Sequence, residues 1–427
     1  MTWPLVRLES LIAETRNGLY KHADFYGRGT AILKMFNLQK GQLDLDRVDR
    51  VELDPEELSA YRLRPGDILM NRVNTPELVG KCAVIPAELG EAVFESKNIR
   101  IRLRGDLADS RFVASYLNSP FGRPSLCQGV KHAIGMATIN NGDVRNCSVP
   151  LPALKEQRRI VELLEQADGL RRMREEADML ADRILPALFN HCFGEPTSNP
   201  KGWPTSALNE LADFVSGATP SKESAAFWNG TIPWVSPKDM KQQELYDSID
   251  HVSKAALAET NLKLLPRDTA LIVVRGMILA HTVPVCLARV PVSINQDMKG
   301  LLAKGDVTAE FLQWALLAQH SALLRLVTTA AHGTRKLDTD ALGNLEIPVP
   351  PPPQRDLIKK WTGMVREQQA AARKRVECRA SIEQIWRTML HRAFTGELTA
   401  KWREAQMKEL LAEMEQQARL LKRSLVE

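Results

Sequence analysis

The chain holds 427 residues, of which 44% are hydrophobic and 26% charged, a balance typical of a folded protein and a length that favours two or three domains. A formal net charge of +5 is too small to identify a nucleic-acid binder by itself. We expect neither a signal peptide nor a membrane span, and six dispersed cysteines without a Cys-x-x-Cys pair argue against a zinc ribbon and indicate reduced thiols in the cytoplasm.

Residues 1–150 are predicted to form a mixed domain of strands and helices. Short apolar runs such as Ile68-Leu-Met, Cys82-Ala-Val-Ile and Ile99-Arg-Ile-Arg-Leu are bounded by Gly, Pro and Asn, which is the usual pattern of strands. Residues 108–118 have the spacing of a helix. The first part of the chain is therefore expected to be α+β.

Residues 151–199 are predicted to form a long spacer helix. Proline residues at 150 and 152 would keep the chain extended until the helix begins. Apolar residues then recur in steps of three and four, interrupted only at Arg174, and they are Ile160, Leu163, Ala167, Leu170, Ala177, Ala181, Ile184 and Leu188. A buried core helix would give a similar stripe, but spacing sustained over several turns favours a coiled coil.

Residues 200–350 repeat the first domain. Trp3-Pro4 returns as Trp203-Pro204, and Gly29-Thr30 returns as Gly230-Thr231. Seven such matches follow one another in the same order, at offsets between 197 and 201 residues. A single shared dipeptide arises easily by chance, but an ordered series does not, so we predict a pseudo-twofold internal repeat of two units.

Residues 351–427 are predicted to form a distal helix followed by a helical tail. The helix carries a second apolar stripe, at Leu357, Trp361, Met364, Ala371, Cys378, Ile382, Ile385 and Met389. We therefore expect an antiparallel coiled coil between the two long helices. The tail after Glu397 has a stripe of its own, which fits either an extension of this coiled coil or a dock for a partner. Most of the excess positive charge lies in this last segment, with 16 Lys and Arg against 10 Asp and Glu.

Searches for an active site yield one weak pattern. The chain has no Gly-x-x-x-x-Gly-Lys-Ser/Thr loop for ATP and no Asn/Asp-Pro-Pro-Tyr/Phe signature of an amino-methyltransferase. Asp67, Glu95 and Lys97 resemble the metal site of a Mg²⁺-dependent nuclease, in which paired carboxylates and a lysine activate water. The second repeat has Asn295-Gln296 without an equivalent carboxylate, so a turn aspartate and a strand-end lysine are the simpler interpretation. A standalone nuclease remains the alternative hypothesis.

The helix starts carry a family resemblance. The segment Pro150-Leu-Pro-Ala-Leu-Lys-Glu-Gln-Arg-Arg-Ile-Val resembles the start of the central conserved helix of type I restriction-modification specificity subunits. Pro350-Pro-Pro-Pro-Gln-Arg and His391-Arg-Ala-Phe-Thr-Gly-Glu-Leu resemble the distal conserved helix of that family. The similarity covers about residues 1–425, more loosely in the recognition domains, and it departs from the pattern at Pro353, where the first helix start has a glutamate.

The resemblance implies an α+β fold with two target-recognition domains, 1–150 and 200–350, and two helical segments, 151–199 and 351–427. It implies a non-catalytic subunit in which each domain reads half of a bipartite, asymmetric site on double-stranded DNA. Two methyltransferase subunits using S-adenosylmethionine and two motor-nuclease subunits using ATP and Mg²⁺ would be its partners, with no cofactor on this chain. A coiled-coil assembly protein without a DNA role is a third hypothesis.

Base reading needs side chains with paired hydrogen-bond donors and acceptors, chiefly Arg or Lys for guanine and Asn or Gln for adenine. For any one residue, an ordinary solvated surface is a strong competing interpretation. In the first domain the predicted DNA contacts are Asn71, Arg72, Asn74, Lys97, Asn98, Lys131 and His132. In the second domain they are Ser236, Lys238, Arg275, Asn295, Gln296, Arg335 and Lys336.

Overall fold

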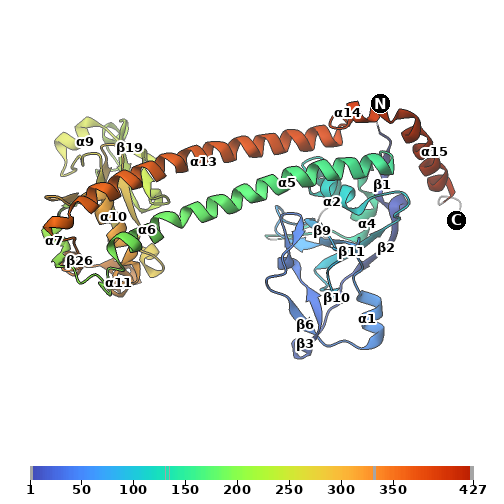
Figure 1. The fold of residues 1–427 in the computed structure, drawn as a ribbon, viewed down its shortest axis with the longest axis horizontal. Coiled ribbons are helices and arrows are strands. Elements are labelled where there is room, and N and C mark those ends of the chain that lie inside the picture. Colours follow the sequence, from blue (N-terminus) through green and yellow to red (C-terminus); the bar gives the residue numbers. More distant parts are fainter. Residues whose placement is uncertain (1–2, 130, 134, 330–332, 424–427) are drawn as a thin grey trace. The chain divides into compact units, whose positions relative to one another are not determined.

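The computed structural model describes residues 3–129, 131–133, 135–329 and 333–423. The chain divides into two compact units (Figure 1). Unit 1 comprises Met1–Arg174 and Arg379–Glu427, and unit 2 comprises Glu175–Cys378. Each unit thus contains one mixed domain together with parts of both long helices, whereas the division into four segments stays a prediction.

A four-stranded antiparallel sheet forms the centre of unit 1. Its order is β2 (Ile12–Asn17), β11 (Asn98–Leu103), β7 (Ile68–Asn71) and β9 (Cys82–Val84). Successive residues of β7 face opposite sides. Ile68 and Met70 join the core that contains helix α2 (Ser110–Asn118), and Leu69 joins a second core that contains Phe94. Because both faces are covered, β7 is apolar without alternation.

Smaller sheets and short helices complete unit 1. One three-stranded sheet has the order β10 (Ala92–Phe94), β3 (Tyr26–Leu33) and β6 (Asp49–Val51). Another has the order β12 (Lys131–Ala133), β13 (Met136–Thr138) and β8 (Val73–Asn74). Two further sheets are strand pairs, β1 (Leu5–Arg7) with β14 (Ser148–Pro150) and β4 (Leu38–Gln39) with β5 (Gln42–Leu43). The short helices are α1 (Pro55–Tyr61), α3 (Gly122–Leu126) and α4 (Asn141–Asn146).

Unit 2 contains a closely similar arrangement. Its central sheet has the order β16 (Ala212–Ser216), β23 (Met298–Ala303), β20 (Thr269–Val273), β21 (Val285–Ala288) and β18 (Glu244–Leu245), and helix α10 (Ala309–Ala318) packs on it. The smaller sheets are β19 (Asp250–Val252), β17 (Ile232–Val235) and β22 (Ser293–Ile294), then β24 (Val327–Thr329) with β25 (Arg335–Leu337), and β15 (Thr205–Ala207) with β26 (Glu346–Pro348). The short helices are α7 (Leu208–Leu211), α8 (Ala225–Trp228), α9 (Lys254–Glu259), α11 (His320–Arg325) and α12 (Thr339–Gly343).

Backbone hydrogen bonds confirm the predicted repeat, because equivalent bonds recur about 200 residues apart. The N–H of Leu8 donates to the carbonyl of Cys147 at 2.8 Å, as that of Leu208 donates to Leu345 at 3.0 Å. The N–H of Arg104 donates to Leu11 at 2.8 Å, as that of Lys304 donates to Leu211 at 2.9 Å. The N–H of Leu151 donates to Pro4 at 2.9 Å, as that of Val349 donates to Pro204 at 2.9 Å. The α+β fold class predicted from the sequence is therefore confirmed.

Two repeated glycines show why the sequence matches occur where they do. Gly29 has a φ of +91°, and a Cβ atom there would lie 2.5 Å from the carbonyl oxygen of Val51. A Cβ atom on Gly230 would lie 2.1 Å from the carbonyl oxygen of Val252. Only glycine allows this close approach of two backbone segments in either unit, so the Gly-Thr match marks a packing constraint.

The long helices are α5 (Leu154–Asp182), α6 (Ile184–Phe193) and α13 (Asp356–Phe394). The 39 residues of α13 correspond to about 58 Å of helix. In unit 2, Trp361 packs against Phe189 with ring centroids 5.3 Å apart, and further along α13 Arg375 lies 3.7 Å from Asp178. Contacts therefore move backwards along α5 and α6 as they move forwards along α13, which makes the helices antiparallel.

The predicted apolar seam is interrupted by exposed residues and charged contacts. In unit 1 Leu170 is 66% exposed and Ile385 is 59% exposed, although both belong to the predicted stripes. The neighbouring Arg171 contacts Glu383 at 3.4 Å and stacks on the Trp386 ring, 5.2 Å from its centroid. Apolar packing in unit 1 is instead concentrated near the helix ends, where Phe394 packs on α2.

The tail does not extend the coiled coil, so that interpretation was wrong. Helix α13 ends at Phe394, and Gly396 has a φ of +83°. Two further helices follow, α14 (Ala400–Ala405) and α15 (Met407–Arg423) (Figure 1). Gln417 on α15 is buried and donates to the carbonyl of Leu107 at 3.0 Å, so the tail packs on unit 1. Within the described residues, none of the helices has the length and apolar character that crossing a membrane would require.

Candidate nucleic-acid interface

Several predicted contact residues of unit 1 converge at one end of its central sheet. Strand β7 ends at Asn71, which pairs with Asn98 at the beginning of β11. The next residue, Arg72, donates its backbone N–H to the carbonyl of Lys97 at 2.8 Å and accepts the N–H of Ile139 at 2.9 Å. Arg72 therefore lies between the loop that precedes β11 and the β12–β13 hairpin.

Three of the predicted residues form a buried amide network. The side chain of Asn71 accepts a hydrogen bond from Asn74 at 2.8 Å and donates to Asn98 at 3.3 Å. Asn74 also accepts the N–H of Thr75 at 2.9 Å. Buried amides satisfy their hydrogen bonds within the protein, and Asn71 and Asn98 have no exposed surface. In this conformation the three amides bond to one another and shape the loop.

Arg72 and Lys97 are the accessible cations of this group. Lys97 is exposed and Arg72 is half-buried. Within the part of the chain that the structure describes, the Nε atom of Arg72 has no hydrogen-bond partner. Lys131 and His132 lie on β12, opposite Thr138 and Ala137, but their side chains fall outside the described residues.

Unit 2 has the same construction at the corresponding end of its sheet. Val274 donates its N–H to the carbonyl of Asp297 at 2.8 Å and accepts the N–H of Leu337 at 2.9 Å. These bonds match those of Arg72 in unit 1. The following residue, Arg275, forms a backbone bridge with Lys336. The structure thus brings together Arg275, the Asn295–Gln296 loop and the β24–β25 hairpin.

The side chains at this end of unit 2 differ in their availability. Arg275 and Gln296 are exposed. Asn295 is buried and donates to Asp297 at 3.3 Å. Arg335 donates to the hydroxyl of Thr329 at 2.7 Å, and Lys336 donates to Asp338 at 3.1 Å. The Lys336 hydrogen bond, together with backbone N–H groups, lowers the pKa of Asp338 below its ordinary value.

Ser236 and Lys238 lie at the end of β17, beside the Asn295 loop. The backbone N–H of Asn295 donates to the carbonyl of Val235 at 2.9 Å, which joins the two segments. The hydroxyl of Ser236 donates to Asp239 at 2.9 Å and is buried. Lys238 is exposed and contacts Asp250 at 2.7 Å, and this hydrogen bond raises the pKa of Lys238. Of the two, only Lys238 presents its polar group to solvent.

The nuclease hypothesis fails on geometry. Asp67 accepts two hydrogen bonds from Arg102, at 2.7 and 2.8 Å, so its charge is already compensated. Ile68 pairs with Ile101, at the opposite end of the β7–β11 ladder from Asn98. Asp67 is therefore separated from the Glu95–Lys97 loop by about 10–13 Å of strand. Among the described residues no group of three or more His, Cys, Asp or Glu side chains could hold a metal ion.

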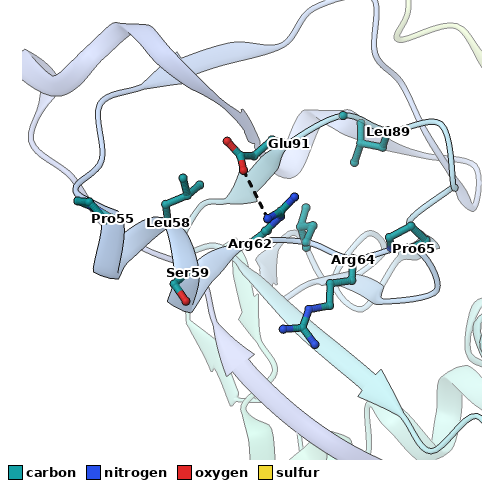
Figure 2. Close-up of a pocket in the computed structure, with 10 residues that line it drawn as sticks. Pro55, Leu58, Ser59, Arg62, Arg64, Pro65, Leu89 and Glu91 are labelled. Atoms are coloured by element: carbon teal, nitrogen blue, oxygen red, sulfur yellow. Dashed lines mark ion pairs between the residues drawn. The ribbon is translucent and has the colours of Figure 1, made fainter.

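A surface pocket lies away from these residues. It has a volume of about 540 Å³ and is lined by α1 and by the segments around residues 62–65 and 89–91. Figure 2 shows Arg62 directed towards Glu91, with a separation of 3.6 Å. None of the predicted contact residues lines the pocket, so the candidate interface is the sheet end of each unit.

Sequence reasoning missed three residues at the sheet end of unit 2. Thr219 hydrogen-bonds to Gln296. Met277 and Ile278 follow Arg275 and are both exposed. The sequence offered one signal for this turn, the glycine that directly follows Arg275. In the structure Gly276 has a φ of +134° and the chain changes direction there.

Comparisons with known proteins agree on one family. Residues 200–361 match the family model described as the type I restriction modification DNA specificity domain. The chain is 30% identical over 222 residues to the type I restriction enzyme EcoR124I/EcoR124II specificity subunit of Escherichia coli, a match that covers 50% of this chain and 53% of that protein. The matched segment thus spans about half the length of that relative.

Two solved structures share the fold. One, described as the structural basis of complex assembly and conformational transition of the type I R-M system, superposes with a TM-score of 0.60 at 19% identity and covers 93% of this chain and 98% of the other. The type I restriction-modification system S subunit from M. genitalium superposes with a TM-score of 0.54 at 16% identity and covers 92% and 96%. The family model and the Escherichia coli relative thus both point to type I specificity subunits, to which the chain is similar over about half of its length, and the two solved structures show that the fold is shared.

Proposed function

We propose that the chain is a non-catalytic DNA-specificity subunit in which each unit reads one half of a bipartite site. The observation that carries the proposal is the repeated sheet end. In both units a strand end is hydrogen-bonded on one side to the loop before the next strand and on the other side to a β-hairpin. Hydrogen-bond donors gather at this place in each unit, namely the half-buried Arg72 and the exposed Lys97 in unit 1 and the exposed Arg275 and Gln296 in unit 2.

The differences between the units support an asymmetric site. Arg72 of unit 1 is matched by Val274 in unit 2, and Lys97 is matched by Asp297, according to the equivalent backbone bonds. Arginine and lysine suit guanine, whereas Gln296 suits adenine. Two similar scaffolds with different side chains would read different half-sites, and the product would be an interrupted sequence without a palindrome.

The long helices and the partners complete the proposal. Major-groove faces repeat about every 34 Å, and a helix of about 58 Å, the length of α13, is long enough to set the distance between two half-sites. Methyltransferase subunits would supply S-adenosylmethionine and flip the target base, which is stacked inside the duplex. Motor-nuclease subunits would supply ATP and Mg²⁺. Two copies of each partner, assembled in the cytoplasm, is the arrangement that we propose.

Matched arginine and lysine variants test the proposal. In a complex reconstituted with the methyltransferase subunit, Arg72→Ala should relax selection in one half-site and Arg275→Ala in the other, each by about 5- to 150-fold if the arginine reads a guanine. Arg104→Ala and Lys304→Ala are the controls, because these residues lie at the opposite ends of β11 and β23. Equal losses in both half-sites, or effects no larger than those of the controls, would contradict the assignment of one half-site to each unit.

A further inference from the structure

Two adjacent apolar side chains are exposed within the cationic sheet end of unit 2. Met277 is 65% exposed and Ile278 is 41% exposed. Single exposed apolar residues are common and need no explanation. An adjacent pair that directly follows Arg275 and lies beside the β25 strand of the hairpin is different, because the cationic residues Arg335 and Lys336 of that strand are bonded through their backbones to Gly276 and Arg275.

The turn that carries this pair is held in place by hydrogen bonds and by a buried neighbour. Gly276 adopts a φ of +134° and donates its N–H to the carbonyl of Arg335 at 3.0 Å. The 3₁₀ turn η5 (Met277–Ala280) follows, and Leu279 inside it is buried. Thr282 donates its N–H to the carbonyl of Ile278 at 3.0 Å. A preorganised turn loses little conformational entropy when its exposed side chains meet a ligand.

The neighbouring side chains indicate what that ligand is. Arg275 precedes the turn and is exposed, while Arg335 and Lys336 lie on the strand whose backbone is bonded to Gly276 and Arg275. A partner that fits both features carries negative charge and one small apolar group. Duplex DNA offers this combination in its major groove, where the 5-methyl group of thymine is the apolar group that a base edge presents.

We propose that Met277 and Ile278 contact the 5-methyl group of a thymine in the half-site read by unit 2. This inference rests on the proposed function and names a specificity contact within it. Arg275 and Gln296 would supply the hydrogen bonds to neighbouring bases or phosphates. The apolar pair would distinguish a thymine from a cytosine at one position, because cytosine lacks the methyl group.

Replacement of thymidine by deoxyuridine tests the contact, since it removes only the methyl group. The probe is a duplex containing the site that the complex methylates, with each thymidine replaced in turn, and the protein is the full chain bound to its methyltransferase subunit. One replacement in the unit 2 half-site should weaken binding about three- to tenfold, the effect of losing one buried methyl group. The Met277→Ala, Ile278→Ala double variant should bind both probes equally at that position.

Two further variants keep the test decisive. Leu264→Ala removes an apolar side chain of unit 2 that is 49% exposed but lies outside the sheet-end loops, and it should keep the wild-type sensitivity to deoxyuridine. Met277→Gln preserves side-chain length and should reduce that sensitivity, because one of the two apolar contacts is lost. The inference is overturned if no deoxyuridine in this half-site weakens wild-type binding, or if the double variant retains the effect. Failure of Arg275→Ala to alter this half-site would instead count against the proposed function.

Discussion

The buried carboxylate of Glu156 leads to a quantitative prediction about the C-terminal tail. Glu156 is 1% exposed. It accepts hydrogen bonds from the Nε of Arg403 at 2.7 Å, the hydroxyl of Thr399 at 2.6 Å and the indole N–H of Trp3 at 3.2 Å. Arg403 is its only charged partner among these three. The Arg403→Met variant keeps much of the side-chain volume but leaves the carboxylate charge uncompensated.

Removing one member of a buried ion pair costs about 3–5 kcal/mol. Since each 1.4 kcal/mol is a factor of ten, opening of the tail should become roughly a hundred- to several thousandfold more frequent. Hydrogen–deuterium exchange of the peptides covering α15 measures this opening directly. The remaining amides of unit 1 that do not contact the tail should exchange at nearly the wild-type rate.

An exposed ion pair in the same region provides the control. Lys155 contacts Glu409 of α15 at 2.7 Å, but the two side chains are 46% and 59% exposed. Lys155→Met should therefore cost no more than about 1 kcal/mol. The Glu156→Leu, Arg403→Met double variant should recover much of the loss, because no charge remains buried. The reasoning is refuted if Arg403→Met accelerates exchange of α15 no more than Lys155→Met does.

Three further predictions concern the cores of the two units. Burial lowers the pKa of Arg289, but its hydrogen bonds to carboxylates outweigh burial and raise it. Arg289→Met leaves these carboxylates without their buried cation, so the free energy of unfolding of unit 2 in urea should fall by about 3–5 kcal/mol; a loss no larger than that of an exposed ion pair would contradict this. Gly29→Ala should lower the free energy of unfolding by about 1–3 kcal/mol. Gly90→Ala is the control, because no atom lies within 4 Å of its Cβ position, and it should change the free energy of unfolding by no more than about 0.5 kcal/mol. Thermal denaturation measures both changes. Burial raises the pKa of the Cys286 thiol to about 12, so alkylation at pH 8 should modify the exposed Cys378 long before Cys286, and comparable rates would argue against that burial.

Local patterns were enough to predict the internal repeat and the α+β fold class. The repeat was visible because residues such as Gly29 and Gly230 meet the same packing constraint, and the helix starts were marked by proline. The apolar seam could not be predicted reliably, because spacing cannot distinguish a buried Ile160 from an exposed Leu170. Which positions are covered depends on where the partner helix runs and on which charged residues, such as Arg171, contact it.

The candidate site could be predicted only in part. Polar residues suggested separate loops at Asn71–Asn74 and at Lys97–Asn98, and only the structure shows that the backbone of Arg72 is hydrogen-bonded to that of Lys97. The burial of Asn71 and Asn98 was not predictable, because it depends on amide hydrogen bonds between segments 27 residues apart in the chain. Convergence of the hairpin on the same sheet end depends on the pairing of β8 with β13, which no local pattern specifies.

Methylome sequencing tests the central claim most directly. Cells that express the chain with its methyltransferase partner should gain one methylated sequence, made of two unlike half-sites separated by a spacer of fixed length. Exchanging residues 200–350 for the corresponding domain of another specificity subunit should change one half-site and leave the other intact. A continuous or palindromic site, or the loss of both half-sites together in a folded complex, would contradict the account.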